Sequence, residues 1–249
     1  MKQSRFLGLL CSMALSLLFA SCGGGSSEKA ATTDSTTTDT TAKAPAPAPV
    51  AVNTIVTAPE NMLIVTHKVA NYGKWLTAYE AHDSARKANG VHSYVIGRGL
   101  NDSNMVMVAL KLDDVAKAKA MFKDPKMKSV MQKSGVVGEP TVSFLTATWQ
   151  DTAKIDTKLR SRTTFEVKDF DAWQKSFEDG KQERLDNGIT DRVISHDVDN
   201  NKKVGLVTAV LDTAKAFAYY KSDALKKRRA AGGVIGEPKR FLFNIVKRY

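Results

Sequence analysis

A histidine followed four residues later by an arginine is the pair of side chains in this sequence best suited to chemistry. His82 and Arg86 fall in a segment with helical periodicity, where residues four apart share one face. A histidine can act as a general base near neutral pH, and an arginine can bind a carboxylate or stabilise a developing enolate. We therefore take His82 and Arg86 as candidate catalytic residues. The alternatives are a solvated histidine and an arginine in a structural ion pair or helix cap.

Aromatic side chains accompany this pair at regular spacings. The candidate binding residues are His67, Tyr72, Trp75, Tyr79 and Tyr94. Three of them recur at helical spacing, while the histidine and the last tyrosine fall in flanking segments with strand character. An aromatic cavity with a few polar groups is the usual profile of a small-molecule pocket. The alternative is that these aromatic residues only form the contact between a helix and a sheet.

Chemistry based on metals or thiols is not expected. The chain has four histidines and two cysteines, Cys11 and Cys22. No two histidines stand four residues apart, as metal ligands on one helix would, and processing at the N-terminus would leave Cys22 alone. We predict no metal site and no cofactor.

The first 21 residues have the pattern of a bacterial signal peptide. Lys2 and Arg5 precede an apolar run over residues 6–19, which is too short for a relaxed membrane-spanning helix. The run ends in Leu-Phe-Ala-Ser-Cys-Gly at 18–23, which resembles a bacterial lipobox. The sequence therefore predicts a lipoprotein anchored through a lipid on Cys22. The glycine that follows favours the outer membrane, on its periplasmic or outer face, and the alternative is an ordinary signal peptide.

Residues 22–58 are predicted to form a flexible tether. They consist mainly of Gly, Ser, Thr, Ala and Pro, with alternating Ala-Pro at 44–49. Such a stretch cannot bury enough apolar surface to fold, and alternating proline keeps it extended. Its expected role is to space the rest of the chain from the membrane.

The rest of the sequence is one module written twice. A shift of 98 residues places 62–149 on 160–247 without a gap, and 22 of the 88 pairs are identical. The identical pairs include Trp75 with Trp173 and Arg86 with Arg184. This internal repeat predicts a first module over residues 59–151 and a second over 158–249.

Each module has strand and helix signals in the order βαββαβ. In the first module, strands are expected at 62–68, 91–98, 105–112 and 142–148. Helices are expected at 71–90 and 114–135, and Asp124-Pro125 would interrupt the second one. We therefore predict an α+β fold made of two tandem ferredoxin-like modules.

This arrangement resembles the dimeric α/β-barrel superfamily, which includes antibiotic-biosynthesis monooxygenases, polyketide-cyclase-like proteins and haem-binding relatives. The likeness rests on the broken second helix, on Val-Val-Gly-Glu-Pro at 136–140, and on His-x-Val-x-x-Tyr-x-x-Trp at 67–75. It implies that the modules pack sheet against sheet into an intramolecular dimeric α/β-barrel, so that the chain is a monomer. Haem-binding relatives carry an axial histidine on the second helix, and 114–133 and 212–231 contain none.

The first strand differs between the modules on one of its faces. Met62 and Ile64 in the first module correspond to Arg160 and Arg162 in the second. If this face points into a barrel, the arginines would line an interior that attracts anions. The alternative, which the sequence favours, is that the second copy of this strand is frayed and its arginines lie in water.

The formal net charge of +11 points to anionic lipids or polymers as further partners. The densest basic run is Lys-Lys-Arg-Arg at 226–229. It could contact lipid headgroups beside the anchor, although such a run is more often a solvated helix face. No nucleic-acid-binding motif accompanies it, so nucleic acid is not expected as a partner.

Three functions are compatible with these features. The first is a lipid-anchored envelope protein that binds a small organic molecule. The second is a cofactor-independent monooxygenase-like or cyclase-like enzyme acting in the first module, and the third is a structural protein that contacts anionic polymers. We favour the first because the second module lacks two of the candidate groups. Gly180 stands in place of His82, and Arg192 in place of Tyr94.

Overall fold

Two similar halves make up the described part of the chain, and each has the element order βαββαβ. The structure, a computed structural model, describes residues 53–249. The predicted signal peptide, Cys22 and most of the predicted tether lie outside the described residues. Within 53–249, no helix is long and apolar enough to span a membrane.

The first half contains four strands and four helices of the described chain, preceded by the two-residue strand β1 (Ile55–Val56). The strands are β2 (Glu60–Val69), β3 (Val91–Gly99), β4 (Met105–Leu112) and β5 (Val136–Asp151). The helices are α1 (Tyr72–Ala81), α2 (Asp83–Ala88), α3 (Val115–Lys123) and α4 (Pro125–Lys133).

The second half repeats this series. Its strands are β6 (Leu159–Val167), β7 (Ile189–Asp197), β8 (Lys203–Val210) and β9 (Val234–Arg248). Its helices are α5 (Phe170–Asp179), α6 (Lys181–Asp186), α7 (Thr213–Lys221) and α8 (Asp223–Ala231).

The first helical segment of each half begins at a side-chain cap and breaks in its middle. The side chain of Asn71 accepts a hydrogen bond from the backbone N–H of Lys74, as the sequence predicts for a helix N-terminus. The continuous helix predicted at 71–90 is wrong, however, because His82 leaves helical geometry at φ −94° and ψ 12° and separates α1 from α2. Gly180 makes the same break between α5 and α6. The predicted interruption of the second helix, at Asp124, is present.

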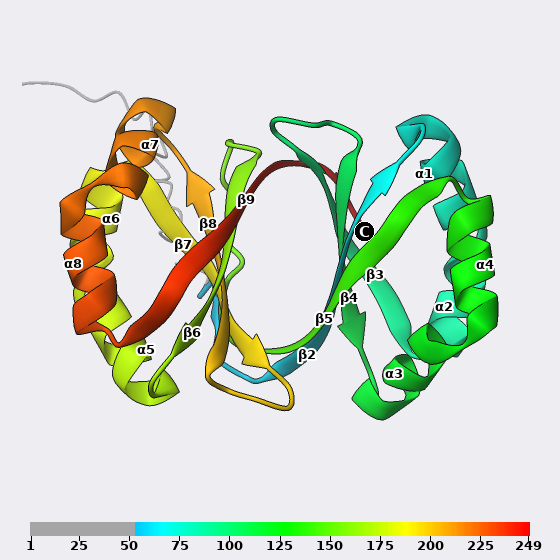
Figure 1. Ribbon diagram of the computed structural model, residues 1–249, viewed down its shortest axis with the longest axis horizontal. Coiled ribbons are helices and arrows are strands. Elements are labelled where there is room, and N and C mark those ends of the chain that lie inside the picture. The colour runs from blue at the N-terminus through cyan, green and yellow to red at the C-terminus, as the bar shows by residue number, and fades with distance from the viewer. Residues whose placement is uncertain (1–52) are drawn as a thin grey trace, which may run out of the picture. The chain divides into compact units, whose positions relative to one another are not determined.

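The nine strands of the described residues form one closed antiparallel sheet. Its order is β5-β2-β4-β3-β9-β6-β8-β7, β7 pairs again with β5, and β1 adds to the end of β5. The halves meet at two seams, where β3 pairs with β9 and β5 pairs with β7. Figure 1 shows the resulting barrel between α1–α4 on one side and α5–α8 on the other. The predicted fold is confirmed: an α+β protein whose two ferredoxin-like βαββαβ modules form an intramolecular dimeric α/β-barrel.

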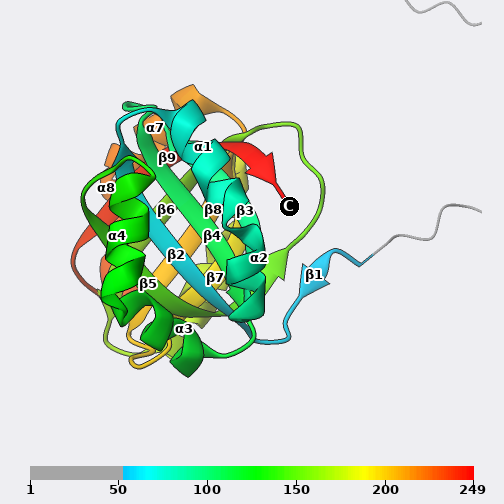
Figure 2. The same ribbon diagram turned by 90° about the vertical axis from the view of Figure 1, so that its right-hand side faces the viewer.

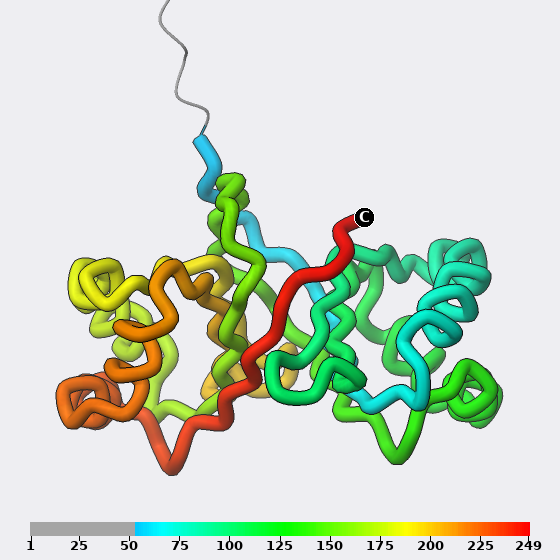
Figure 3. Tube along the Cα trace, turned by 90° about the horizontal axis from the view of Figure 1, so that it is seen from above, coloured from blue at the N-terminus to red at the C-terminus, as the bar shows by residue number. Residues whose placement is uncertain are grey.

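The side chains of each barrel strand alternate between two compartments. On β2, Leu63 and Val65 pack beneath the helices of the first half, whereas Met62 and Ile64 face the barrel interior. Figure 2 shows α1, α2 and α4 in front of the sheet of the first half, and Figure 3 shows helices on the outer side of the sheet in both halves. Neighbouring residues of one strand therefore serve different sites.

The last strand of each half is longer than the sequence predicts. β5 runs from Val136 to Asp151 rather than over 142–148. Most of β5 pairs with β2, and its end pairs with β7 of the other half and with β1. The added residues before 142 pair with β2 of the same half, and those after 148 pair with β7 of the other half and with β1.

Candidate functional site

A cavity of about 210 Å³ lies between the sheet and the helices of the first half. Five of the seven predicted site residues line it: His67, Trp75, Tyr79, His82 and Arg86. The rest of its wall is mainly apolar and comes largely from α3, α4 and β4. The structure therefore brings most of the predicted cluster together, and places Tyr72 and Tyr94 elsewhere.

His67 is the most deeply buried polar side chain of this cavity. It lies on β2 with 4% of its surface exposed, and its ring centroid is 5.4 Å from that of Trp75. Neither ring nitrogen has a hydrogen-bond partner among the described residues. Burial lowers the pKa of His67 from 6.5 to about 4, so the imidazole is neutral at physiological pH. A neutral imidazole offers one donor and one acceptor, and both are unused here.

Trp75 and Tyr79 form a fixed aromatic wall beside His67. Their rings stack at a centroid distance of 5.2 Å, and Trp75 is 3% exposed. The Tyr79 hydroxyl is hydrogen-bonded to the Ser93 hydroxyl on β3 at 2.7 Å, which ties helix α1 to the sheet. Burial raises the pKa of Tyr79, so its hydroxyl stays protonated and acts only in hydrogen bonding.

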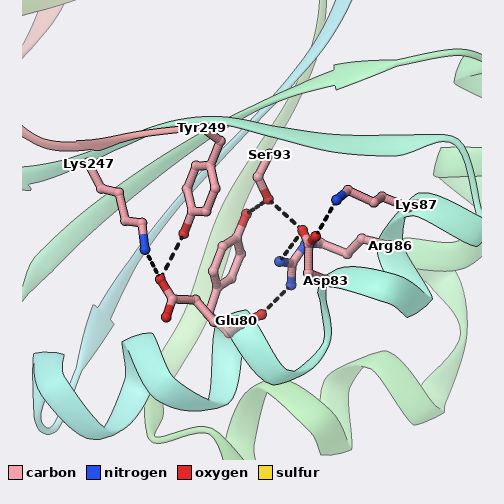
Figure 4. Close-up of polar contacts among 8 residues, drawn as sticks. Glu80, Asp83, Arg86, Lys87, Ser93, Lys247 and Tyr249 are labelled. Atoms are coloured by element: carbon pink, nitrogen blue, oxygen red, sulfur yellow. Dashed lines mark hydrogen bonds and ion pairs between the residues drawn. The ribbon is translucent and has the colours of Figure 1, made fainter.

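Arg86 is held against this wall by groups of α1 and α2. Its guanidinium lies 3.7 Å from the centroid of the Tyr79 ring. Nη1 donates to the Tyr79 carbonyl oxygen at 2.6 Å, and Nη2 donates to the Asp83 carboxylate at 3.1 Å. Figure 4 shows Arg86 together with Asp83 and Ser93. Nε is buried without a partner in the described part of the chain, so its N–H is the donor that a ligand could use.

The equivalent arginine of the second half has a structural role. Nε and Nη2 of Arg184 donate to the two carboxylate oxygens of Asp191 at 2.8 and 2.6 Å. Nη1 donates to the carbonyl oxygen of Phe177 at 2.6 Å, as Arg86 does to Tyr79. Ser93 occupies the position of Asp191 in the first half, so Arg86 lacks this carboxylate. The contact that Arg86 and Arg184 both make with the preceding helix supports the alternative of an ion pair or helix cap. Because the first half lacks the carboxylate of Asp191, the Nε of Arg86 is left without a partner among the described residues.

His82 lies at the edge of the cavity and not in its interior. It is exposed and sits at the junction of α1 and α2, where its side chain makes no cap hydrogen bond. The backbone N–H of Arg86 donates a hydrogen bond to the His82 carbonyl oxygen at 3.1 Å, in the first turn of α2. The two residues are therefore joined by a backbone hydrogen bond, but only the Arg86 side chain packs against the aromatic wall.

Tyr72 and Tyr94 do not line this cavity. Tyr72 is half-buried, and its ring centroid lies 5.8 Å from that of Trp75. The Arg98 guanidinium lies 4.2 Å from the Tyr72 ring centroid. Tyr94 lines the barrel interior together with Val95, because a β-bulge between Ser93 and Val95 interrupts the alternation of faces, while Ser93 points to the helices. The prediction that Tyr94 belongs to the same cluster is wrong for this reason.

The equivalent space in the second half is largely filled. Its cavity measures about 80 Å³. Phe165 replaces His67, and Tyr219 and Tyr220 replace Met121 and Phe122. Larger and aromatic side chains thus occupy the volume that stays open in the first half, and a ligand site is expected in the first half alone.

The methionines of the second helical pair are the wall residues that sequence reasoning missed. Met121, Met127 and Met131 line the cavity of the first half. Comparison with the repeat could have found them, because Tyr219 stands at the position of Met121. Methionine is unbranched and adaptable, and it suits a wall that adjusts to a bound molecule.

The polar groups of this cavity suit hydrogen bonding more than metal binding. Within 53–249, no three His, Cys, Asp or Glu side chains come together as a metal site requires. Among the described residues, no carboxylate is hydrogen-bonded to His67 to orient it, and the Nε donor of Arg86 is buried without a partner. The arrangement can hold an apolar molecule that carries a single polar group.

Comparisons with known proteins give similarity to solved structures only. No protein-family profile matches the chain, and no curated protein matches it in sequence. An anthrone oxidase-like protein is 14% identical over 78% of this chain and 94% of its own, with a TM-score of 0.49. A monooxygenase-like protein from Listeria innocua is 6% identical over 78% of this chain and 98% of its own, with a TM-score of 0.46. A heme-binding protein from Thermus thermophilus is 8% identical over 78% and 94%, with a TM-score of 0.45. At such low identities, function has to be argued from the residues of this chain.

Proposed function

We propose that this chain is a lipid-anchored cell-envelope protein that binds a small, mainly apolar organic molecule in the cavity of the first half. The observation that carries the proposal is His67, a buried neutral imidazole with both ring nitrogens unpartnered among the described residues. Leaving a buried polar group without a hydrogen bond costs stability. A ligand that supplies a hydroxyl or carbonyl group would remove this cost.

The size of the cavity limits the ligand to about one ring. An apolar cavity of about 150 Å³ can hold benzene, and the present cavity measures about 210 Å³. Its walls are aromatic and aliphatic side chains, with His67 and the Arg86 Nε as the buried polar groups. A monocyclic molecule with one hydroxyl or carbonyl substituent, of the size of a substituted phenol, fits these features.

Binding without reaction fits the polar groups better than catalysis does. His82 is exposed, and two nitrogens of Arg86 are engaged by Tyr79 and Asp83. A general base normally acts with a group that orients it and a group that stabilises developing charge. His67 has neither as a direct partner.

A cofactor-independent monooxygenase-like or cyclase-like activity in the first half is the second candidate. One observation favours it: His67 is unprotonated at neutral pH and could take a proton from a bound hydroxyl group. An enzyme of this kind would convert a phenolic ligand and, as a monooxygenase, consume dioxygen. Unchanged ligand recovered after prolonged incubation in air would favour the binding protein.

The third candidate, a structural protein contacting anionic polymers, is weakened by the contacts of the basic run at 226–229. Arg228 forms an ion pair with Glu183, and Lys226 pairs with Asp223 at 3.3 Å. Arg229 is partly buried, which lowers its pKa. Arg228 and Lys226 are thus paired within the second half and Arg229 is partly buried, so this run offers an anionic polymer fewer free charges than its sequence suggests.

His67→Phe is expected to lower the affinity for p-cresol at least about tenfold, because the variant removes the hydrogen-bonding group and fills part of the cavity. Phenylalanine is the residue at the equivalent position of the second half, Phe165, so the fold accommodates it. Titration calorimetry with p-cresol, and with toluene as the ligand that lacks a hydroxyl, measures the effect. His82→Gly, which copies Gly180, is the matched control and should bind p-cresol as the wild type does.

The pH dependence of the free energy of unfolding tests whether His67 is buried and neutral in the folded protein. The folded pKa of His67 is about 4 and the unfolded value is 6.5, so only the unfolded chain takes up this proton between these values. The wild type should therefore lose roughly 3 kcal/mol as the pH falls from 6.5 to 4, a loss that His67→Phe should lack. Equal p-cresol affinity in wild type and His67→Phe would rule out the proposed site.

Anchoring through Cys22 is tested separately, because it is independent of the cavity. Cys22→Ala is expected to abolish labelling by radioactive palmitate and to release the protein from the membrane fraction. Cys11→Ala, which changes the other cysteine, should retain label and anchoring. Membrane retention of unlabelled Cys22→Ala at the wild-type level would contradict the lipid anchor.

A further inference from the structure

The barrel interior holds a second and larger cavity of about 670 Å³. This volume lies within the range of about 300–1,000 Å³ that is usual for ligand pockets. The sheet separates it from the first cavity, since Met62 and Ile64 line it while Val65 and His67 line the other. Residues 152–156, which follow β5, border it where the chain passes from one half to the other.

Four arginines of the second half line this interior. They are Arg160, Arg162, Arg192 and Arg248. Arg160 and Arg192 are 3% and 8% exposed, Arg162 is half-buried, and Arg248 is exposed. The expectation that Arg160 and Arg162 lie in water on a frayed strand is wrong, because β6 pairs along its length with both β8 and β9.

The positive charge of this group is only partly neutralised within the described chain. Arg192 forms an ion pair with Asp151 at 3.0 Å. Arg160 donates only to two backbone carbonyl oxygens, at 2.7 and 3.0 Å. Among residues 53–249, no ion pair involves Arg160, Arg162 or Arg248. An unpaired charge turned toward the interior lowers the stability of the fold, and a bound anion would offset this loss.

Burial lowers the pKa of both Arg160 and Arg162, and repulsion from neighbouring arginines acts on Arg160 as well. Burial lowers the pKa of Arg162 to about 10. Burial, followed by the charges of Arg192 and Arg248, lowers the pKa of Arg160 to about 10. Both groups stay charged at neutral pH, and a bound anion would relieve the repulsion that Arg192 and Arg248 exert on Arg160.

The first half has no charge at the four equivalent positions. The residues that stand 98 positions before the arginines are Met62, Ile64, Tyr94 and Gln150. All four also line the cavity. Met107, Ala109 and Leu145 extend this wall with apolar side chains. The interior therefore has a cationic wall from one half and a mainly apolar wall from the other.

We propose that the barrel interior is a second binding site, which takes an amphipathic organic anion. Its carboxylate, sulfate or phosphate head contacts Arg160 and Arg162, and its apolar body lies against the wall formed by the first half. Guanidinium groups bind such oxyanions through charge-assisted hydrogen bonds. The site is independent of the cavity that contains His67.

Titration calorimetry of the full-length protein with octyl sulfate tests this site. Wild-type protein is expected to bind octyl sulfate at least about tenfold more tightly than 1-octanol, octylammonium or inorganic sulfate, each of which lacks one of the two features. Octanoate in the same titration shows whether the arginines also accept a carboxylate. Arg162→Ile and Arg160→Met, which copy the first half, should each weaken octyl sulfate about tenfold or more without lowering Tm.

Two further variants keep the test decisive. Arg240→Met removes a positive charge from the same half on the helix side of the sheet, where Arg240 lies 3.5 Å from the Tyr220 ring centroid, and should leave binding unchanged. Arg248→Gln changes an exposed side chain to its counterpart and should fold even if the buried variants do not. It is expected to weaken octyl sulfate a few-fold. Unchanged octyl sulfate affinity in every folded variant of Arg160, Arg162 and Arg248, or inorganic sulfate binding as tightly as octyl sulfate, would overturn the proposal.

Discussion

Replacing Trp173 with alanine is expected to lower the free energy of unfolding by roughly 3–5 kcal/mol. Its side chain is 4% exposed, and its ring centroid lies 5.2 Å from those of both Phe165 and Phe177. Deleting the indole leaves a space that these neighbours cannot fill. Trp75→Ala should cost less, about 3 kcal/mol, because Trp75 borders a cavity of about 210 Å³, whereas the cavity beside Trp173 measures about 80 Å³.

Urea unfolding followed by circular dichroism measures both losses. The comparison is controlled internally, because the two tryptophans occupy equivalent positions of the repeat. Lys74→Ala, which changes an exposed residue of the same helix, should leave stability nearly unchanged. A larger loss at Trp75 than at Trp173 would mean that the first cavity is closed in solution.

The fold could be predicted from the sequence because each of its signals is local or repeated. Apolar periodicity, caps such as Asn71 and the break at Asp124 specify the elements, and the repeat specifies that the elements occur twice. The break at His82 was missed because nothing in its residue types marks it. His82 and Arg86 continue the helical spacing that ends in Tyr79, and the change of backbone geometry at His82 to φ −94° and ψ 12° is small.

The candidate site was predicted in part, and the missing part depends on long-range geometry. His67, Trp75 and Tyr79 come together because one helix packs on one strand, which periodicity describes. Tyr94 could not be placed without knowing which face of β3 the helices cover. Arg160 and Arg162 were expected in water because burying charge is costly, and only closure of the barrel turns their face inward.

Asp191→Ala is expected to destabilise the protein by about 3–5 kcal/mol, because it leaves a buried guanidinium without its partner. Arg184 and Asp191 are 6% and 8% exposed, and two hydrogen bonds of 2.8 and 2.6 Å join them. Water cannot replace the carboxylate without entering the space beneath α6. Urea unfolding of Asp191→Ala and of the wild type at neutral pH measures the loss.

The paired replacement separates the ion pair from the packing around it. Arg184→Met with Asp191→Leu removes both charges together, and it should recover most of the stability that Asp191→Ala loses, since an apolar pair needs no desolvation of charge. In the first half, Asp83→Ala removes a single and more exposed partner of Arg86 and should cost much less. If Asp191→Ala is as stable as Asp83→Ala, the pair contributes little to folding. The retention of an arginine in both halves would then have to come from its contact with the helix carbonyl, which Arg86 and Arg184 make at the same distance of 2.6 Å.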